Sequence, residues 1–474
     1  MSFQAQLAMI LWLPITIYLF KKFSPRKAVI VSFLGGLLFL PRKAGFALPL
    51  IPDYEGMIAT CYGIFIAIII YDSQIFRKFK FSWFDLPIIL FGISPFFSSL
   101  SNFSDLNIIF ALYDGINQSI SQSFQWGMPY FLGRLYLNNL SGLKELAINT
   151  IKGGLIYVPL CLYEIRMSPQ IHTMVYGYFP HSFGQTMRLG GWRPQVFMNH
   201  GLMLGLFMMT ATLLAIWLWQ GKVIKKIWGI PMEWVVVILL VTFILIKSTG
   251  AYVLLFAGLM VLASAKWLRS NLPLILLMIG IVYYLAIATT GNFNGDNLVR
   301  FANNSFGEER SQSLEFRLDN EKLLGERARE RILFGWAGWG RNKVLTADWK
   351  GDLEDKSVTD SYWIIVFGVN GLFGLITLIT SLLLPVFYFA VFRYPAKTWF
   401  HPQVASAAVL SVSLILFVID SLVNAMFNPI FPLISGGLSG LVLNNVPSKN
   451  KKRKKLAIKP KQLSPLRTSI TKKC

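Results

Sequence analysis

Five ionisable residues from separate parts of the chain have types that could bind and transfer a phosphorylated substrate. Four are cations, Arg188, Arg193, Lys247 and Arg317, and the fifth is the carboxylate Asp360. Arginine forms forked hydrogen bonds with phosphate oxygens, and a carboxylate near a hydroxyl group can act as a general base. Together they predict a basic pocket that holds a phosphate or pyrophosphate beside one proton acceptor.

Four of these residues also have a plain structural alternative. Lys247 could extend its ammonium group to the edge of the membrane, and Arg193 could only cap a loop. Arg317 could pair with Glu321 on the exposed face of a helix, and Asp360 could be a helix N-cap. The sequence leaves both interpretations open.

Other ionisable residues lie within apolar surroundings, where charge is costly and needs a reason. We expect His200 to be a hydrogen-bonded packing residue. Asp114 begins a polar run over 114–125, which either packs against other helices or lines a wet cavity. Glu164 and Asp420 lie near the middle of predicted helices.

The composition is that of a membrane protein. Of 474 residues, 54% are hydrophobic and only 14% are charged, and the mean hydropathy is +0.53. Soluble proteins carry about 25% charged residues, so we exclude a soluble enzyme and, despite a formal net charge of +22, a nucleic-acid-binding protein. Cys61, Cys161 and Cys474 show no metal-ligand spacing and cannot form a disulfide framework. We therefore expect neither a metal site nor a cofactor.

Thirteen stretches resemble membrane-spanning helices, which need about 20 mostly apolar residues. We therefore expect an all-α polytopic membrane protein with about 12 to 13 transmembrane helices. The stretch 361–391 is long enough to tilt or to extend past the bilayer. The thirteen stretches cover residues 5–20, 28–41, 57–72, 84–100, 108–132, 146–165, 196–219, 233–247, 250–266, 271–290, 361–391, 404–424 and 429–444.

Lysine and arginine in the short loops set the expected orientation. The tail from Val446 carries eleven Lys or Arg residues and no acid, which places the C-terminus in the cytoplasm. Alternate loops then fall on the same side, and each is basic. The net charge of +22 therefore marks mainly the cytoplasmic face, and the N-terminus is expected outside.

Two loops on the outer side carry most of the candidate residues. Loop A (166–195) contains Arg188 and Arg193. Loop B (291–360) contains eleven basic and thirteen acidic residues, and we expect it to include short helices, one of them near 314–334. The two loops divide the chain into N-terminal transmembrane helices (1–165), loop A, central transmembrane helices (196–290), loop B, C-terminal transmembrane helices (361–445) and a basic cytoplasmic tail (446–474) that we expect to be disordered.

Short motifs accompany these loops. After loop B, Asp360-Ser361 is followed by nine residues and then by Gly371-Leu-Phe-Gly374. A glycine-rich segment, Gly335–Gly340, precedes them, and Lys247-Ser-Thr-Gly250 forms a tight turn between apolar stretches. Arg193–Gly201 leads into a central helix.

These motifs, over roughly residues 185–380, resemble the superfamily of O-antigen ligases and O-antigen polymerases. That family has about a dozen helices, one large extracytoplasmic loop late in the chain, and after it His-(Asn/Ser/Gln), nine residues and Gly-x-x-Gly. Its Pro-x-x-Gly-x-Gly stretch and its Ser-Arg-Gly hairpin resemble the segments at 335–340 and 247–250. The chain departs from the family pattern where Asp360 replaces the histidine.

The resemblance implies a metal-independent, inverting glycosyltransferase of a bacterial cytoplasmic (inner) membrane, active in polysaccharide or exopolysaccharide biosynthesis for the cell envelope. The donor would be a polyprenyl-pyrophosphate-linked glycan, and the acceptor a glycan or a lipid. Because the histidine is missing, we prefer a polymerase to a ligase. The implied roles are pyrophosphate binding for Arg188, Arg193, Lys247 and Arg317, catalysis for Asp360, and motif or packing roles for Ser361, Gly371 and Gly374.

Two other functions remain open. A transporter of a lipid or amphiphile would use the polar run from Asp114 together with Glu164 and Asp420. A membrane subunit of a polysaccharide-export system would have no activity of its own. Transport predicts essential residues near the middle of the membrane, whereas transfer chemistry predicts them at its outer edge.

Overall fold

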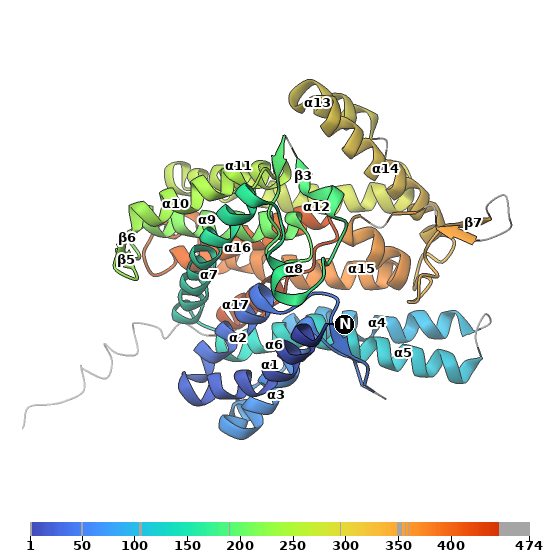
Figure 1. The fold of residues 1–474 in the computed structure, drawn as a ribbon, viewed down its shortest axis with the longest axis horizontal. Coiled ribbons are helices and arrows are strands. Elements are labelled where there is room, and N and C mark those ends of the chain that lie inside the picture. The colour runs from blue at the N-terminus through green and yellow to red at the C-terminus, as the bar shows by residue number, and fades with distance from the viewer. Residues whose placement is uncertain are drawn as a thin grey trace, which may run out of the picture.

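Helices dominate the described part of the chain, which comprises residues 2–48, 51–103, 107–188, 190–293, 295–347, 353–355, 357, 358 and 360–444 of a computed structural model (Figure 1). The predicted tail 446–474 lies outside these residues. The α-helices are α1 (Phe3–Lys22), α2 (Pro25–Phe39), α3 (Gly56–Tyr71), α4 (Leu86–Ser101), α5 (Ile108–Gln122), α6 (Met128–Tyr136), α7 (Leu140–Met167), α8 (Ile171–Tyr176), α9 (Gly201–Gln220), α10 (Met232–Leu245), α11 (Thr249–Ala263), α12 (Leu272–Thr290), α13 (Asp296–Phe306), α14 (Glu308–Arg329), α15 (Tyr362–Tyr388), α16 (Ala405–Ser421) and α17 (Ile430–Leu443).

Short elements join or extend these helices. In the part of the chain that the structure describes, four antiparallel hairpins pair β1 (Gly45–Phe46) with β2 (Tyr54–Glu55), β3 (Met187–Arg188) with β4 (Gly191–Trp192), β5 (Lys226–Ile227) with β6 (Ile230–Pro231), and β7 (Leu345–Ala347) with β8 (Leu353–Asp355). Single π-helical turns extend α5, α11 and α15 at Ser123–Gly127, Ser264–Leu268 and Phe389–Arg393. Short 3-10 helices cover Ser73–Lys78, Trp83–Asp85, Phe183–Thr186 and Ala396–Thr398.

The helices are those of a polytopic membrane protein, as the sequence predicts. Among the described residues, seven helices are long and apolar enough to cross a membrane, and four shorter apolar helices accompany them. Each of the thirteen predicted apolar stretches contains a helix. Apolar side chains of α12, among them Ile279 and Tyr283, are more than half exposed. Such a surface would favour aggregation in water but fits lipid.

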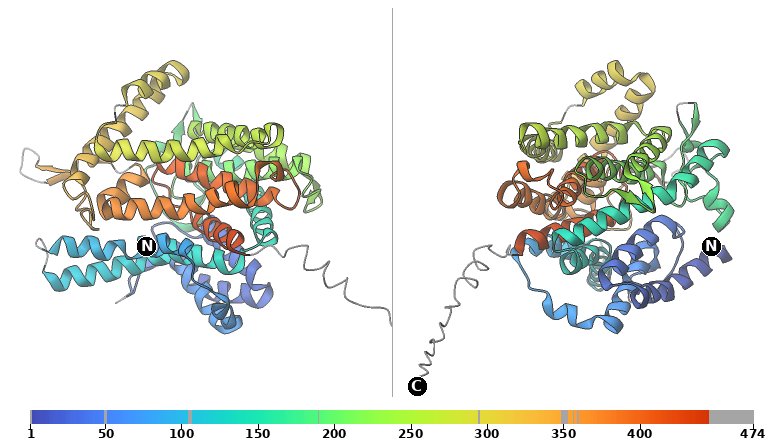
Figure 2. Two further views of the ribbon diagram at one scale, coloured as in Figure 1. Left: turned by 180° about the vertical axis from the view of Figure 1, so that it is seen from behind. Right: turned by 90° about the vertical axis from the view of Figure 1, so that its left-hand side faces the viewer.

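The bundle is built around α9, whose apolar segment is 94% buried. Helices α7, α10, α11 and α16 pack against it. The first three helices form a group of their own, α4 and α5 pack together on α15, and α6 packs on α17 (Figure 2). Helices α6 and α17 approach closely because Gly133 and Gly436 each face the backbone of the opposite helix, with which a Cβ atom would collide.

The loops of the central helices gather at two opposite ends of the bundle. At one end, the Trp217 indole donates to the Trp399 carbonyl oxygen at 3.3 Å, and the Lys266 ammonium lies 4.5 Å from the centre of the Phe400 ring. The other end collects loop A, the turn between α10 and α11, and loop B. The candidate residues therefore come from loops at one end, which we call the site end.

Helix α15 is sharply bent, which the sequence did not predict for the stretch 361–391. Gly371 has φ of +65°, outside helical geometry. Tyr362 and Leu382 line the same small cavity, although a straight helix would place them about 30 Å apart. The segment before Gly371 therefore folds back beside the segment after it.

The bend at Gly371 is held by the glycine-rich segment of loop B. The Trp336 and Ala337 amides donate to the carbonyl oxygens of Gly368 and Val369 at 2.8 and 2.9 Å. A Cβ atom on Gly371 would lie 2.3 Å from the Leu333 carbonyl oxygen, so only glycine fits this contact. Gly374 is equally tight, since its Cβ would lie 2.2 Å from that of Asn370.

The loop B helix differs from its predicted limits. We expected it near 314–334, but α14 spans Glu308–Arg329 and is preceded by α13. Both helices project from the bundle (Figures 1 and 2). The chain after Arg329 forms turns and then the irregular segment at 335–340 that the glycines predict.

Candidate functional site

The hairpin of β3 and β4 positions the two arginines of loop A. Arg188 and Gly191 are paired across the hairpin. The Arg193 amide donates to the Thr186 carbonyl oxygen at 2.7 Å, which continues this pairing by one step. Arg193 is only 4% exposed, and a Cβ atom on Gly201 would lie 2.2 Å from its Cδ. Arg193 is therefore a buried cation at the start of α9, and it does more than cap an exposed loop.

Glu164, on α7, holds loop A in place through hydrogen bonds to backbone amides. Its Oε1 accepts a hydrogen bond from the Ile171 amide at 3.0 Å, and its Oε2 accepts from the Gln195 and Val196 amides at 2.7 and 2.8 Å. One carboxylate thus holds both the start of α8 and the residues after Arg193. In the sequence, Glu164 is only an acid within a predicted helix, because its hydrogen-bond partners lie up to 32 positions away.

Lys247 extends over the hairpin from the turn between α10 and α11. Its Nζ lies 2.3 Å from the position that a Cβ atom on Gly191 would occupy. Gly191 is paired with Arg188 in the hairpin, so the ammonium group lies close to this part of loop A. The Lys247 side chain therefore points toward loop A. The alternative, in which it only extends to the edge of the membrane, does not describe this contact.

Arg317 and Asp360 form the loop B part of the site. The Arg317 Nε lies 3.9 Å from the Asp360 Oδ2, and the Asp360 side chain is 38% exposed. Burial lowers the pKa of Arg317, and the negative charges of Asp360 and Asp420 oppose this shift. Ser361 occupies the N-cap position of α15, so the expectation of a plain N-cap at Asp360 is wrong.

Glu321 supports Arg317 from the next turn of α14. It is 8% exposed and accepts hydrogen bonds from the Tyr284 hydroxyl at 2.7 Å, from the Trp363 indole at 3.1 Å and from the Ser361 hydroxyl. Burial raises the pKa of Glu321. The expected Arg317–Glu321 pair on an exposed helix face is wrong, because Glu321 is buried and joins α14 to α12 and α15.

His200 lies among the cations of the site. Burial, together with the charges of Arg193, His181, Arg317 and Arg188, lowers its pKa to about 3. Its Nδ1 accepts from the Leu202 amide at 3.0 Å, so its proton is on Nε2, which faces the Gln185 Oε1 at 3.2 Å. His200 is thus a neutral helix cap, in agreement with the expected packing role.

Arg193 packs against Gly201, the residue after His200, and the charges of Arg188 and Arg317 also act on the His200 ring. Lys247 joins them through the hairpin, and Asp360 through Arg317. The structure therefore gathers all five predicted residues from separate segments at the site end. The arrangement can bind an anion with several positive groups and offers an accessible carboxylate beside it.

Asp420 and Asn424 lie beneath this site and were not singled out for it from the sequence. Asp420 is 6% exposed, and its Oδ1 accepts from the Asn424 Nδ2 at 2.7 Å. Its charge acts on Arg317, and the Asn424 carbonyl oxygen accepts from the Tyr362 amide at 3.2 Å. The end of α16 therefore supports both Arg317 and the start of α15.

The polar run from Asp114 packs against protein groups. Asp114 accepts hydrogen bonds from Arg341 at 2.7 Å, from the Trp339 indole at 2.6 Å and from Ser99 at 3.0 Å. Farther along α5, Ser119 accepts from the Phe96 amide at 3.1 Å. Of the two expectations for this run, the described contacts match packing against α4 and loop B.

Comparisons with known proteins find no match: no protein-family model matches the chain, and no curated protein is similar to it at a significant level.

Proposed function

We propose that this protein is a membrane glycosyltransferase that moves a glycan from a polyprenyl-pyrophosphate carrier to an acceptor glycan or lipid, at the outer face of a bacterial cytoplasmic membrane. One observation carries the proposal. Arg188, Arg193, Lys247 and Arg317 meet at one end of an apolar bundle, beside Asp360. A polyprenyl chain in the bilayer would bring its phosphates to that end, where arginine forks suit their oxygens.

The reaction needs three actions from these residues. The cations bind the pyrophosphate and stabilise the negative charge that grows on it as it leaves. Asp360 accepts the proton of the acceptor hydroxyl. The hydroxyl oxygen then bonds to the anomeric carbon of the donor, the bond from that carbon to the pyrophosphate oxygen breaks, and the carrier departs as polyprenyl pyrophosphate with inversion at the sugar.

Arg317 positions Asp360 for this role. Arg317 is at ion-pair distance from its carboxylate and is itself held by α14, which Glu321 fixes to α12 and α15. Asp360 and the cations thus share one framework. A polymerase is preferred to a ligase because an aspartate stands where ligases have histidine.

The alternative of transport gains no support from the same structure. Asp114 and Glu164, two of the acids on which it would rely, are engaged by protein groups. Both acids serve to hold loops at the site end. No specific contact among the described residues favours a purely structural subunit either.

Deletion of the gene, followed by analysis of lipid-linked glycans and surface polymer, tests the function. Single repeat units accumulating on the carrier would mean a polymerase, and polymer retained on the carrier would mean a ligase. Unchanged lipid-linked glycans and polymer would refute both.

Substitution of Asp360 tests the chemistry. We expect Asp360→Asn to lower transfer about 100-fold or more, since general base catalysis contributes that much, and Asp360→Glu to retain part of it. Asp319→Asn makes the same change at an exposed position of α14 and should leave transfer intact. Full-length polymer made at a normal rate by Asp360→Asn would remove Asp360 from the mechanism.

A further inference from the structure

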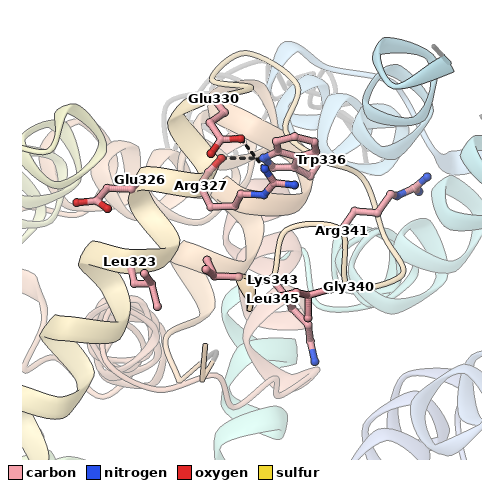
Figure 3. A pocket seen from close by; sticks show the side chains of 10 residues that line it. Leu323, Glu326, Arg327, Glu330, Trp336, Gly340, Arg341, Lys343 and Leu345 are labelled. Atoms are coloured by element: carbon pink, nitrogen blue, oxygen red, sulfur yellow. Dashed lines mark hydrogen bonds and ion pairs between the residues drawn. The ribbon is translucent and has the colours of Figure 1, made fainter. Parts of the chain in front are cut away.

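A second cavity lies on loop B, outside the candidate site. It has a volume of about 570 Å³ and is bounded by the last turns of α14 and by residues 340–345 (Figure 3). Leu323, Arg327 and Trp336 line one part of it, and Arg341, Lys343 and Val344 line another. This volume is within the range of small-molecule binding sites, about 300 to 1,000 Å³.

The charges around this cavity are already balanced. Arg327 pairs with Glu330 at 2.5 Å, Lys343 with Asp355 at 2.6 Å, and Arg341 with Asp114 at 2.7 Å. Glu326 adds one further negative charge to the lining, and Arg331, whose guanidinium lies 4.3 Å from the centre of the Trp336 ring, adds one positive charge. A ligand with a net charge would therefore find no excess of opposite charge among these groups.

The lining combines apolar surface with fixed polar groups. Leu323, Val344 and Leu345 supply aliphatic contacts. The Arg327 guanidinium lies 3.4 Å from the centre of the Trp336 ring, whose indole donates to the Arg327 carbonyl oxygen at 2.7 Å (Figure 3). Paired guanidinium and carboxylate groups keep further donors and acceptors for a ligand.

A neutral saccharide has the matching properties, because it carries hydroxyl groups that donate and accept, apolar C–H faces and no net charge. We propose that this cavity binds a neutral saccharide unit of the glycan on which the protein acts. Binding of a saccharide stands on the cavity itself, whereas its place in glycan transfer rests on the proposed function.

The wall of the cavity is held in a strained shape. Ala337 and Trp339 have φ of +61° and +62°, a region that residues other than glycine seldom occupy. The Asn102 Nδ2 bonds to the Gly335 carbonyl oxygen at 3.0 Å, and the Trp339 indole bonds to Asp114. Strained backbone that its surroundings fix in place is typical of functional sites.

Short contacts connect the cavity to Asp360. The Val344 amide donates to the Ser357 hydroxyl at 3.2 Å, and the Val358 amide donates to the Asn320 Oδ1 at 2.8 Å. The cavity wall is thus bonded to the segment that ends at Asp360, and α14 borders both places. A glycan held in the cavity could extend along α14 toward the transfer site.

Photocrosslinking in living cells tests the proposal even while the sugar is unidentified. The full-length protein would carry Val344→p-benzoylphenylalanine, and its covalent adducts would be purified and hydrolysed to identify sugars. We expect neutral sugars on this variant. Phe301→p-benzoylphenylalanine, on the exposed surface of α13, is the control and should carry at least about tenfold less.

Blocking the cavity gives a second, independent result. Leu323→Trp fills the cavity and should lower the Val344 adduct about tenfold or more, whereas Phe301→Trp adds an aromatic ring elsewhere and should not. Acidic sugars, phospholipid or no adduct at Val344 would overturn the proposal, as would an adduct that Leu323→Trp leaves unchanged in a folded protein.

The same experiment separates this proposal from the proposed function. If deletion of the gene leaves the glycans unchanged but Val344 still forms saccharide adducts, the cavity is a saccharide site and the proposed glycan transfer is refuted. If polymer synthesis depends on Asp360 but Val344 forms no adduct, the proposed glycan transfer is supported and the saccharide site in the cavity is refuted.

Discussion

At the scale of single residues, His200 shows how the surroundings of the site shift a pKa. The surrounding cations and burial keep its ring neutral, with a pKa of about 3 against an ordinary value of 6.5. The unfolded chain takes up this proton as the pH falls below about 6.5, whereas the folded chain does not. Folding stability is therefore lost as the pH falls from 6.5 toward 3, by at most about 1.4 kcal/mol per pH unit.

Replacement of this side chain should remove the effect. His200→Asn keeps an N-cap oxygen for the Leu202 amide but cannot titrate. We expect its unfolding temperature in detergent to fall less between about pH 6.5 and pH 5 than that of the natural protein. Equal slopes for His200→Asn and the natural protein would contradict the low pKa.

A second residue, Glu164, acts on the site from a distance. Glu164→Gln would replace one acceptor oxygen by a donor and leave at least one of three buried amides unsatisfied, at about 1 to 3 kcal/mol each. We expect loop A to be cleaved faster by protease and glycan transfer to fall, while the bundle stays folded. Glu145→Gln, on the same helix, is the matched control, and equal cleavage of both variants would refute the role of Glu164 in holding loop A.

The sequence indicated the cations but not the groups that hold them. Arg188, Arg193, Lys247 and Arg317 could be singled out because they lie on the predicted outer side, where the topology does not explain cations. Glu321 and Asp420 could not, since their partners come from other helices. A carboxylate on a helix has the same appearance in sequence whether it faces water or three buried donors.

At the scale of elements, the sequence predicted helices well and their ends less well. Apolar runs fix where a helix must be, because the backbone has to satisfy its own hydrogen bonds in lipid. The bend within α15 depends on a contact with residues 332–337, so its one local sign was Gly371. The polar loop B helix began six positions before its predicted start, because no apolar boundary marks it.

The bend in α15 gives a prediction at this scale. Gly371→Ala combines a left-handed φ with a Cβ atom 2.3 Å from the Leu333 carbonyl oxygen. We expect it to destabilise the protein by about 3 kcal/mol or more, seen as a lower unfolding temperature and reduced membrane yield. Gly280→Ala in α12 meets nothing within 4 Å and should be neutral or slightly stabilising. Similar stability of the two variants would mean that α15 is not bent at Gly371.

At the scale of the whole molecule, the bundle has two ends with different charge. The end opposite the site collects short loops rich in lysine and arginine, including those around Lys222, Lys266 and Arg393. Loop B, at the site end, has eleven basic and thirteen acidic residues. The positive-inside rule therefore predicts that the site lies outside the cytoplasm, where the proposed lipid-linked donor would be available but nucleotide sugars would not.

Cysteine labelling tests this orientation directly. Cys61 and Cys161 are fully buried, so a membrane-impermeant maleimide should report on Cys474 and on introduced positions. On spheroplasts we expect the reagent to modify Phe301→Cys in α13, in a Cys474→Ser background, and to leave Cys474 of the natural chain unmodified until the membrane is opened. The reverse pattern would place Asp360 and the four cations on the cytoplasmic side. Nucleotide-linked donors would then be accessible, and the argument for a polyprenyl-linked donor would fail even if Asp360 were essential.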